Sequence, residues 1–369
     1  DLAEYSDVDR ITIGDPNADA ARILIDDLGD DRLDYVDIDV TDTERAVSIL
    51  EGYDVVMDGT TITLNGFSTE CIAKAGCHGI NLNGFGAEYP FDGLFRQNNR
   101  IHVPGFGMTP GTTDMMVRFA ADQMEAVEIV RVSHGAFRPI AFSPSITETT
   151  VVEYDPNLED RVVFEDGEFK QVSPFSRERM IDLPEPYGSH PQWIIPHSET
   201  RTVHEYLKDK GIRLIETRGT WPPRNMLLVR ALYEWGILNN APIDVEGKRI
   251  GVMDAVSRYL QGSEVGTTTD LYGYALHVEV VGTKEGKKTR NILTHTHPAS
   301  DGSVAGWEKL RAYTRCVGIP LGIATHLIAK GRSQGTGVVI PEKAFDPGEV
   351  FRELAKRQIM IHVEEEELD

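Results

Sequence analysis

The sequence predicts an α/β protein in which a doubly wound parallel sheet is followed by a mixed or antiparallel sheet. Two patterns carry this prediction. In the first third of the chain, short apolar segments alternate with single helical segments, which is typical of βαβ units and parallel strands. Beyond residue 112 the apolar segments lengthen, and two of them flank a turn as the strands of a hairpin do.

The charge of the chain limits the partners it can bind. Its 369 residues contain 37 Lys and Arg against 59 Asp and Glu, a formal net charge of −22. Nucleic acids and anionic membranes attract basic surfaces, which argues against both as partners. No apolar run is long enough to span a membrane. Three cysteines without metal-type spacing favour a reducing cytoplasm over a disulfide framework.

Turn and cap residues define the elements of the first 112 residues. Thr41-Asp42-Thr43-Glu44 fits a capping box before a helix at residues 45–50, and Gly76 ends a helix at residues 68–75. Another helix is expected at residues 18–28. The expected buried strands are residues 10–14, 35–40, 54–58, 79–82 and 101–103.

One expected motif is absent. A dinucleotide fold normally has a G-x-G-x-x-G turn after its first strand, and this sequence has none in that place. The chain opens with Asp1-Leu2-Ala3-Glu4-Tyr5, which looks like the end of a helix. We therefore expect a strand and a glycine-rich turn upstream of Asp1, about 25–30 residues by the size of a βαβ unit.

The remaining two thirds are expected to hold the second sheet. Residues 126–133 and 274–283 have strand character, and residues 289–296 return as the second strand of a hairpin. Residues 143–223, rich in Pro, Ser and charge, predict irregular structure and short helices over a site. The C-terminal part is expected to contain a helix at residues 306–329, a helix at 351–356, a strand at 359–362 and a solvated acidic tail at 364–367.

Acidic residues and glycines at strand ends predict a Rossmann-type dinucleotide site. Ligands of doubly wound sheets bind beyond the carboxyl ends of the strands. Asp15 ends the first strand, where an acid accepts hydrogen bonds from the adenosine ribose, and Asp39 flanks the adenine or caps the next helix. Gly59 and Thr60 lie on the expected path of the pyrophosphate and nicotinamide ribose. No Arg or Lys follows Asp15 within six residues, which favours NAD over NADP.

Several segments, in their order and spacing, resemble the saccharopine dehydrogenase family, and most of all its lysine 6-dehydrogenase-like branch. They include ITIGDPN, DVVMDGTTITLN, HVPGFGMTPGTTDMM, ETRGTWPP and TRCVGIPLGIATHLIAKG. The resemblance implies an NAD(P)-binding domain at residues 1–112, an inserted α/β domain at 113–304 that dimerises and lines the substrate site, and a segment at 305–369 that returns to the first domain. It also implies an enzyme that oxidises or forms C–N bonds of amino acids or polyamines.

The family's G-x-x-P-G turn is present and adds Gly107 to the expected cofactor site. Two departures border the expected pocket. Gly105 stands where the family usually has a polar or thiol residue, and the motif of Arg218 continues to Pro222-Pro223 instead of Gly-His. The resemblance therefore does not fix lysine as the substrate.

Amine oxidation by hydride transfer needs a clamp for the substrate's charges and an acceptor for its proton. Arg218 is expected to bind a substrate carboxylate through its planar guanidinium, with a salt bridge as the structural alternative, and Arg138 is a second candidate. His197 or a bound water is the expected proton acceptor. Further candidate site residues are Glu216, Glu199, Trp193, Trp221 and Ser143.

Two other functions stay open. A Rossmann dehydrogenase that oxidises a CH–OH group usually relies on a Lys near the nicotinamide, and none occurs between Gly79 and Pro110. The other alternative is a non-catalytic dimeric binding protein on the same fold. His295 and His297 share a strand face, but no third ligand is evident nearby, so we expect no metal. We expect a homodimer that binds a small, amino-acid-like molecule.

Overall fold

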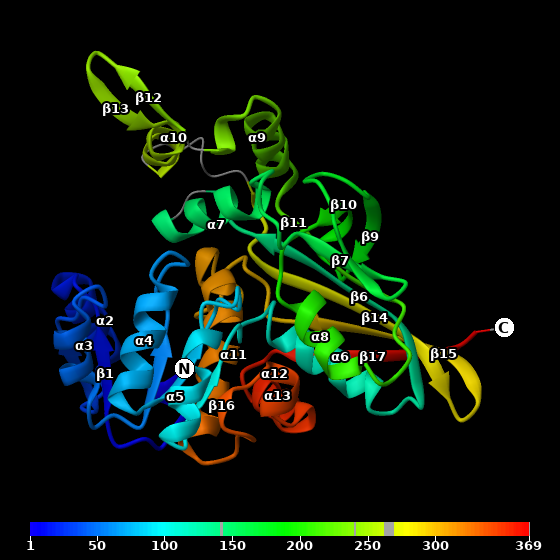
Figure 1. The fold of residues 1–369 in the computed structure, drawn as a ribbon, viewed down its shortest axis with the longest axis horizontal. Helices are drawn as coiled ribbons and strands as arrows, with labels where there is room; N and C mark the ends of the chain where they lie inside the picture. Colours follow the sequence, from blue (N-terminus) through cyan, green and yellow to red (C-terminus); the bar gives the residue numbers. More distant parts are fainter. Residues whose placement is uncertain (141–142, 240, 262–268, 369) are drawn as a thin grey trace. The chain divides into compact units, whose positions relative to one another are not determined.

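The structure is a computed structural model that describes residues 1–140, 143–239, 241–261 and 269–368 (Figure 1). The chain forms two compact units. Unit 1 contains Asp1–Thr112 and Val317–Leu354, and unit 2 contains Thr113–Cys316 and Ala355–Asp369. The predicted fold class is confirmed, because unit 1 has parallel strands and unit 2 has a mixed sheet. Within the described ranges, no helix has both the length and the apolar character needed to cross a membrane.

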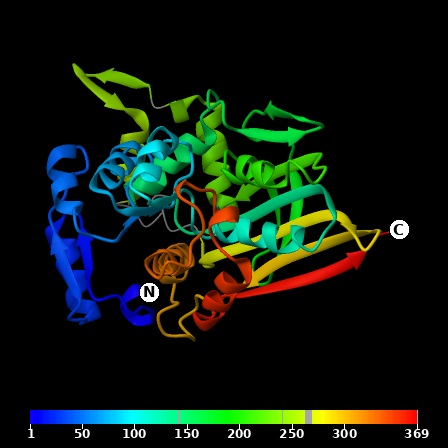
Figure 2. The same cartoon turned by 60° about the horizontal axis from the view of Figure 1, so that its bottom comes forward.

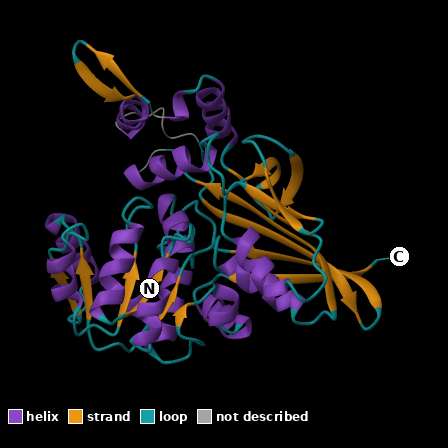
Figure 3. Cartoon of the chain, in the orientation of Figure 1, coloured by secondary structure: helices purple, strands orange, loops and turns teal. Residues whose placement is uncertain are grey.

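Parallel strands separated by helices form unit 1 (Figure 3). They belong to two sheets: β1 (Ile11–Gly14) pairs with β2 (Leu33–Val36), and the other sheet has the order β16 (Gly337–Val338), β5 (Ile101–Val103), β4 (His78–Asn81), β3 (Val55–Asp58). Its helices are α1 (Leu2–Tyr5), α2 (Ala18–Leu28), α3 (Thr43–Leu50), α4 (Asn65–Ala75), η1 (Tyr89–Phe91), α5 (Asp92–Gln97), α12 (Pro341–Ala344) and most of α11 (Leu310–Ala329) and α13 (Pro347–Lys356).

Local signals explain the helix ends of unit 1. The Asn17 side chain accepts the N–H of Ala20 at the start of α2, and Gly29 ends that helix in the left-handed conformation. Asp42 caps α3 by accepting the N–H of Arg45, which corrects the predicted capping box because Asp42, not Thr41, occupies the cap position. Apolar side chains of α4 and α5 then pack together in a buried core cluster.

Among the described residues, a nine-stranded mixed sheet forms the centre of unit 2. Its main path is β17, β15, β14, β6, β11, β10, β9, and β7 and β8 continue from β11. The strands are β6 (Ala126–Phe137), β7 (Val162–Glu165), β8 (Glu168–Gln171), β9 (Arg179–Leu183), β10 (Gly188–Ile194), β11 (Leu214–Thr220), β14 (Gly273–Lys284), β15 (Lys287–Thr296) and β17 (Met360–Glu367). The predicted hairpin is β14 and β15.

The remaining elements of unit 2 surround this sheet or extend from it. They are α6 (Thr112–Ala121), α7 (Pro144–Tyr154), α8 (Glu199–Leu207), α9 (Pro223–Glu234), η2 (Ile237–Asn239), the hairpin β12 (Pro242–Val245) and β13 (Lys248–Gly251), and α10 (Val252–Gln261). The expectation of irregular structure at residues 143–223 is wrong, because β7 to β11 lie there. These strands are short: β7 pairs with β8 and β9 with β10 as local hairpins, whereas β11 pairs with β6, which is distant in sequence.

The acidic C-terminus also differs from its prediction. Residues 364–367 belong to β17, which pairs antiparallel with β15 at the edge of the sheet (Figure 2). Three of these glutamates form ion pairs with Lys and Arg side chains of β14 and β15, so they are not only solvated. One example is the pair of Lys287 Nζ and Glu367 Oε2 at 2.9 Å. The last strand belongs to unit 2, whereas Val317–Leu354 belongs to unit 1, to which the resemblance assigned all of residues 305–369.

The side chains of successive residues in a strand point to opposite faces of the sheet, and paired residues of neighbouring strands point to the same face. On the α8 face, Thr217 of β11 is 3.1 Å from the Thr200 hydroxyl of α8, and His134 of β6 lies beside Gly219. The opposite face carries Arg131, Glu216, Arg218 and Glu279, and we call it the ion-pair face. Residues one apart in β11 therefore face different surroundings.

Candidate functional site

The residues predicted to bind a dinucleotide lie in unit 1, mostly just after parallel strands. Asp15 follows β1 and is exposed, and its carboxylate accepts the N–H of Asn17 at 2.7 Å. Gly59 follows β3, and a Cβ added there would meet no atom within 4 Å. The Thr60 N–H donates to Asp58 at 2.8 Å. This open backbone fits the close approach of a dinucleotide at the strand ends.

Asp39 lies farther from its strand than expected. The sequence predicted a strand over residues 35–40, but β2 ends at Val36. The Asp39 carboxylate accepts the backbone N–H and the hydroxyl of Thr41, at 2.9 and 2.7 Å, and these bonds lower the Asp39 pKa. The exposed carboxylate therefore stabilises the turn before α3, which matches the capping alternative more closely than a contact to adenine.

Gly107 forms a tight turn with Gly111. Its N–H donates to the Pro110 carbonyl at 2.7 Å, and its carbonyl accepts the N–H of Thr112 at 2.9 Å. Gly111 has a φ of +109°, and a Cβ there would lie 2.6 Å from the Gly107 nitrogen. Only glycine fits this position, which explains the second glycine of the motif.

A buried polar network at the carboxyl end of β4 was not predicted. It joins Asn65, Asn81, Glu88 and His102, of which none is more than 1% exposed. Burying this many polar groups is unfavourable unless they bind one another. The available sequence signal was the asparagine at the end of the apolar strand HGIN.

Arg218 and Glu216 form a pair on the ion-pair face. The Arg218 guanidinium donates from Nε and Nη2 to the two Glu216 oxygens, at 3.1 and 3.0 Å, and from Nη1 to the Arg177 carbonyl. Arg131 and Arg179 also contact Glu216, at 3.2 and 3.6 Å. A substrate carboxylate would have to replace Glu216, so the geometry matches the salt-bridge alternative for Arg218.

In the part of the chain that the structure describes, Arg138 has no such acidic partner. It follows β6, is 2% exposed, and its guanidinium carbon lies 5.0 Å from the Trp221 ring centre and 5.5 Å from that of Tyr313. Its Nη1 donates to the Pro139 carbonyl at 3.3 Å, and its Nε has no partner among the described residues. A buried guanidinium without a carboxylate is costly, and a bound anion would relieve that cost.

His197 lies between two buried acids. Its Nδ1 is 3.4 Å from Glu199 and its Nε2 is 3.8 Å from Glu153. Burial alone would lower the His197 pKa, but Glu199 and Glu153 outweigh burial and raise it to about 10. The ring is therefore an imidazolium at neutral pH.

His134 stacks against His197, with ring centres 5.2 Å apart. Burial, and then the charge of His197, lower the His134 pKa to about 3, so this ring is neutral. Gly219 makes room for it, because a Cβ there would lie 2.9 Å from His134 Cε1. The Tyr274 ring lies 6.1 Å from His134 and stacks on Tyr313, which in turn lies beside Arg138.

We call this group on the α8 face the β6–α8 cluster. Its members are His134, Arg138, Glu153, His197 and Glu199. It brings together the predicted residues Arg138, His197 and Glu199, and the predicted Trp221 lies beside Arg138. It does not include Arg218 or Glu216, which face the other side of the sheet. Ser143 caps α7 by accepting the N–H of Ile146 at 3.3 Å, and its contact with a substrate stays a prediction.

Sequence reasoning missed His134 and Glu153. His134 occupies an inward position of the strand AVEIVRVSHGAF, and that signal was available. Glu153 lies in α7, inside the stretch expected to be irregular, and had no signal of its own. Trp193, predicted as a lining residue, is a buried residue of β10 that pairs with Gly219.

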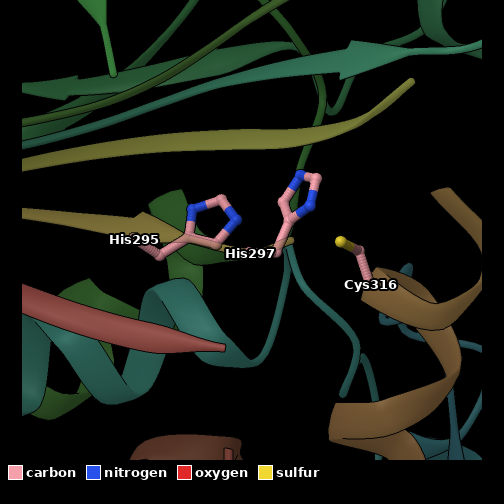
Figure 4. A group of neighbouring side chains, drawn as sticks. All are labelled: His295, His297 and Cys316. Atoms are coloured by element: carbon pink, nitrogen blue, oxygen red, sulfur yellow. The ribbon is translucent and has the colours of Figure 1, made fainter. Parts of the chain in front are cut away.

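The structure places the Cys316 thiol near His295 and His297. Ligand atoms of His295, His297 and Cys316 lie within 4.8 Å of one another (Figure 4). The Leu276 N–H donates to His295 Nδ1 at 3.2 Å, which places the proton on Nε2, a nitrogen that has no hydrogen-bond partner among the described residues. Burial raises the Cys316 pKa to about 12, which favours the thiol. The proton on His295 Nε2 and the thiol proton of Cys316 both disfavour binding of a metal ion. The absence of a metal stays a prediction.

Comparisons with known proteins agree on one family. The model of the saccharopine dehydrogenase C-terminal domain matches residues 107–359, and that of the saccharopine dehydrogenase NADP binding domain matches residues 1–101. The fold is similar to apo saccharopine dehydrogenase (L-Glu forming) from Saccharomyces cerevisiae, with a TM-score of 0.68 and 14% identity over 100% of this chain and 96% of that one.

It is also similar to homospermidine synthase from Legionella pneumophila, a structure in complex with NAD. That match has a TM-score of 0.65 and 13% identity over 99% of this chain and 87% of that one. At these identities the two structures establish the fold alone. The family models cover nearly the whole sequence, and the chain therefore belongs to the saccharopine dehydrogenase family.

Proposed function

We propose that the protein is an NAD(P)-dependent oxidoreductase that transfers a hydride at a C–N bond of an amino acid or imino acid. Unit 1 would bind the cofactor, and the β6–α8 cluster of unit 2 would bind the substrate. The observation that carries this proposal is the buried guanidinium of Arg138, which has no carboxylate partner among the described residues. Membership of a dehydrogenase family supports the reaction class.

The charges of the β6–α8 cluster suit a zwitterionic substrate. Arg138 provides a planar fork for a carboxylate, backed by the Trp221 ring. Glu153 and Glu199, with His197 between them, provide a negative region for an ammonium group. The Tyr274 and Tyr313 hydroxyls, 3.4 Å apart, add polar groups nearby.

This arrangement changes the role of His197. We expected His197 or a water to accept the ammonium proton, but an imidazolium has no free lone pair for it. We therefore propose that His197 offsets the negative charge of the two buried carboxylates, and that a water molecule accepts the ammonium proton. A bound nicotinamide would supply the hydride acceptor: the carbon that bears the nitrogen would lose a hydride to it, and the C–N single bond would become C=N with release of one proton. We also propose a homodimer, as the resemblance implies, and a cytoplasmic location, which the three cysteines without a disulfide framework favour.

The proposed reaction is tested by nicotinamide reduction. Wild-type protein with NAD or NADP is mixed with amino acids, opines and polyamines, and with polyols and hydroxy acids as the contrasting set. We expect the absorbance of the reduced cofactor to rise with at least one nitrogen-bearing substrate. Activity on CH–OH compounds alone would contradict the C–N assignment, and no reduction with any compound would favour the binding-protein alternative.

We propose NAD as the preferred cofactor, although the matching family model carries NADP in its name. The Asp15 carboxylate would repel a 2′-phosphate, and a penalty of about 1.4 kcal/mol is tenfold in kcat/KM. We therefore expect the wild-type kcat/KM to favour NAD over NADP by about tenfold, and Asp15→Ser to reduce this preference. Asp9 is an exposed acid ahead of β1, and Asp9→Ser should leave the preference unchanged. A wild-type preference for NADP would contradict the assignment.

A further inference from the structure

The Asn81 side chain is the centre of the buried network at the carboxyl end of β4. Its Nδ2 lies 2.9 Å from Asn65 Oδ1, 2.9 Å from Glu88 Oε1 and 3.3 Å from His102 Nε2. Asn65 Nδ2 donates to the same Glu88 oxygen at 2.6 Å. Burial lowers the His102 pKa to about 4 against the attraction of Glu88, so its ring is neutral and its Nε2 can accept.

The other amide atom binds the backbone. Asn81 Oδ1 accepts the N–H of Asn83 at 3.1 Å and that of Gly105 at 3.0 Å, and the Asn81 carbonyl accepts the N–H of Phe106 at 2.8 Å. Two backbone donors require an acceptor, which fixes the oxygen of the amide on this side and the nitrogen toward Glu88. One side chain thereby contacts the segments that follow β3, β4 and β5.

These segments carry residues expected to contact the cofactor. Gly59 and Thr60 lie on the segment after β3, which ends where α4 begins at Asn65, and Gly107 lies on the segment after β5. We propose that Asn81 is a positioning residue, which holds the three segments in the arrangement that binds the nicotinamide half of the cofactor. This inference rests on the proposed function.

The composition of the network supports positioning over simple packing. Apolar side chains would fill the same space without the cost of burying amides and a carboxylate. Directional bonds from one amide instead fix the relative positions of several backbone groups, and partial loss of such a network is strongly unfavourable. The polar network therefore lies at the carboxyl ends of the strands, which is where parallel sheets bind their ligands.

The test measures the dissociation constants of NADH and NADPH by their fluorescence in wild-type protein and three variants. Asn81→Leu removes every side-chain bond of the network centre, and we expect affinity for the preferred cofactor to fall about tenfold or more. Asn81→Asp keeps an acceptor for Gly105 and loses the donors to Glu88. Asn98→Ala is the matched control, because its amide donates to the Ala73 carbonyl at 3.0 Å away from these segments, and it should bind like wild type.

A pH series separates positioning from general destabilisation. The new carboxyl of Asn81→Asp lies beside Glu88, so its pKa should be raised and its proton should return as the pH falls. The protonated carboxyl can again donate to Glu88, and cofactor affinity should recover toward acid pH. Wild type, Asn81→Leu and Asn98→Ala should not show this recovery. The KM for the amino substrate should change less than the cofactor affinity.

Thermal melting shows which variants are folded at the assay temperature. If Asn81→Leu is unfolded, Asn65→Ala removes only one arm of the network and should weaken cofactor binding to a smaller extent. Wild-type affinity in folded Asn81→Leu or Asn65→Ala would overturn the inference and leave the proposed function intact. Loss of folding in all the network variants would also overturn it, in favour of a folding role. A wild-type protein that binds neither cofactor would overturn the proposed function together with this inference.

Discussion

Replacement of Arg138 by alanine is expected to lower kcat/KM for the amino-acid substrate by roughly 30- to several-thousand-fold. Breaking a desolvated charge pair costs about 2–5 kcal/mol, and each 1.4 kcal/mol is about tenfold. The guanidinium is 2% exposed beside Trp221 and has no acidic partner among the described residues, so a substrate carboxylate would be its main counterion. Steady-state kinetics with the substrate found in the screen measures the loss, and cofactor affinity should stay close to wild type.

Two comparisons make this prediction specific. Arg138→Lys keeps the charge and loses the planar fork, so it should recover only part of the activity. Arg218→Ala breaks the pair with Glu216, and we expect it to lower the melting temperature with little change in KM. The opposite result, a raised KM in Arg218→Ala and full activity in Arg138→Ala, would return the carboxylate site to Arg218.

Replacement of His197 by glutamine should destabilise unit 2 by about 3–5 kcal/mol, because it leaves Glu153 and Glu199 buried without their shared positive charge. The wild-type protein should also lose stability in alkaline solution. The folded pKa of His197, about 10, is higher than the ordinary value of 6.5. The stabilisation is therefore fully present below about pH 6.5 and is lost as the pH rises through about 10.

Chemical unfolding at several pH values measures this effect. The wild-type free energy of unfolding should decrease from neutral to alkaline pH, and this part of the decrease should be absent in His197→Gln. His204→Gln is a suitable control, since His204 lies on α8 among the rings of Phe164 and Phe169 and apart from the two acids. Parallel pH profiles for wild type and His197→Gln would contradict the assigned imidazolium.

Local patterns were sufficient for much of the fold. The strand at residues 101–103, the helix at residues 18–28 and the turn before β15 are short-range features, and the structure has each where the sequence indicates it. The strands β7 to β10 form two local hairpins, β7 with β8 and β9 with β10, which the Pro, Ser and charge content of this stretch concealed, whereas β11 pairs with the distant β6. Residues 364–367 were misread because the cations that pair with them lie on β14 and β15.

The candidate site, like the fold, could be predicted from the sequence only in part. The sequence by itself determined the family, the two kinds of sheet, and a set of residues that includes Arg138, His197 and Trp221. Only the tertiary structure decided which of them meet. Arg218 lies three residues before Trp221 but on the opposite face of the sheet, bound to Glu216, because side chains alternate along a strand. Glu216 stands two residues before Arg218 in the same strand, so this pair is local. The surroundings of Arg138, in contrast, come from Trp221 and Tyr313, which are distant from it in the sequence, and no local pattern records that packing.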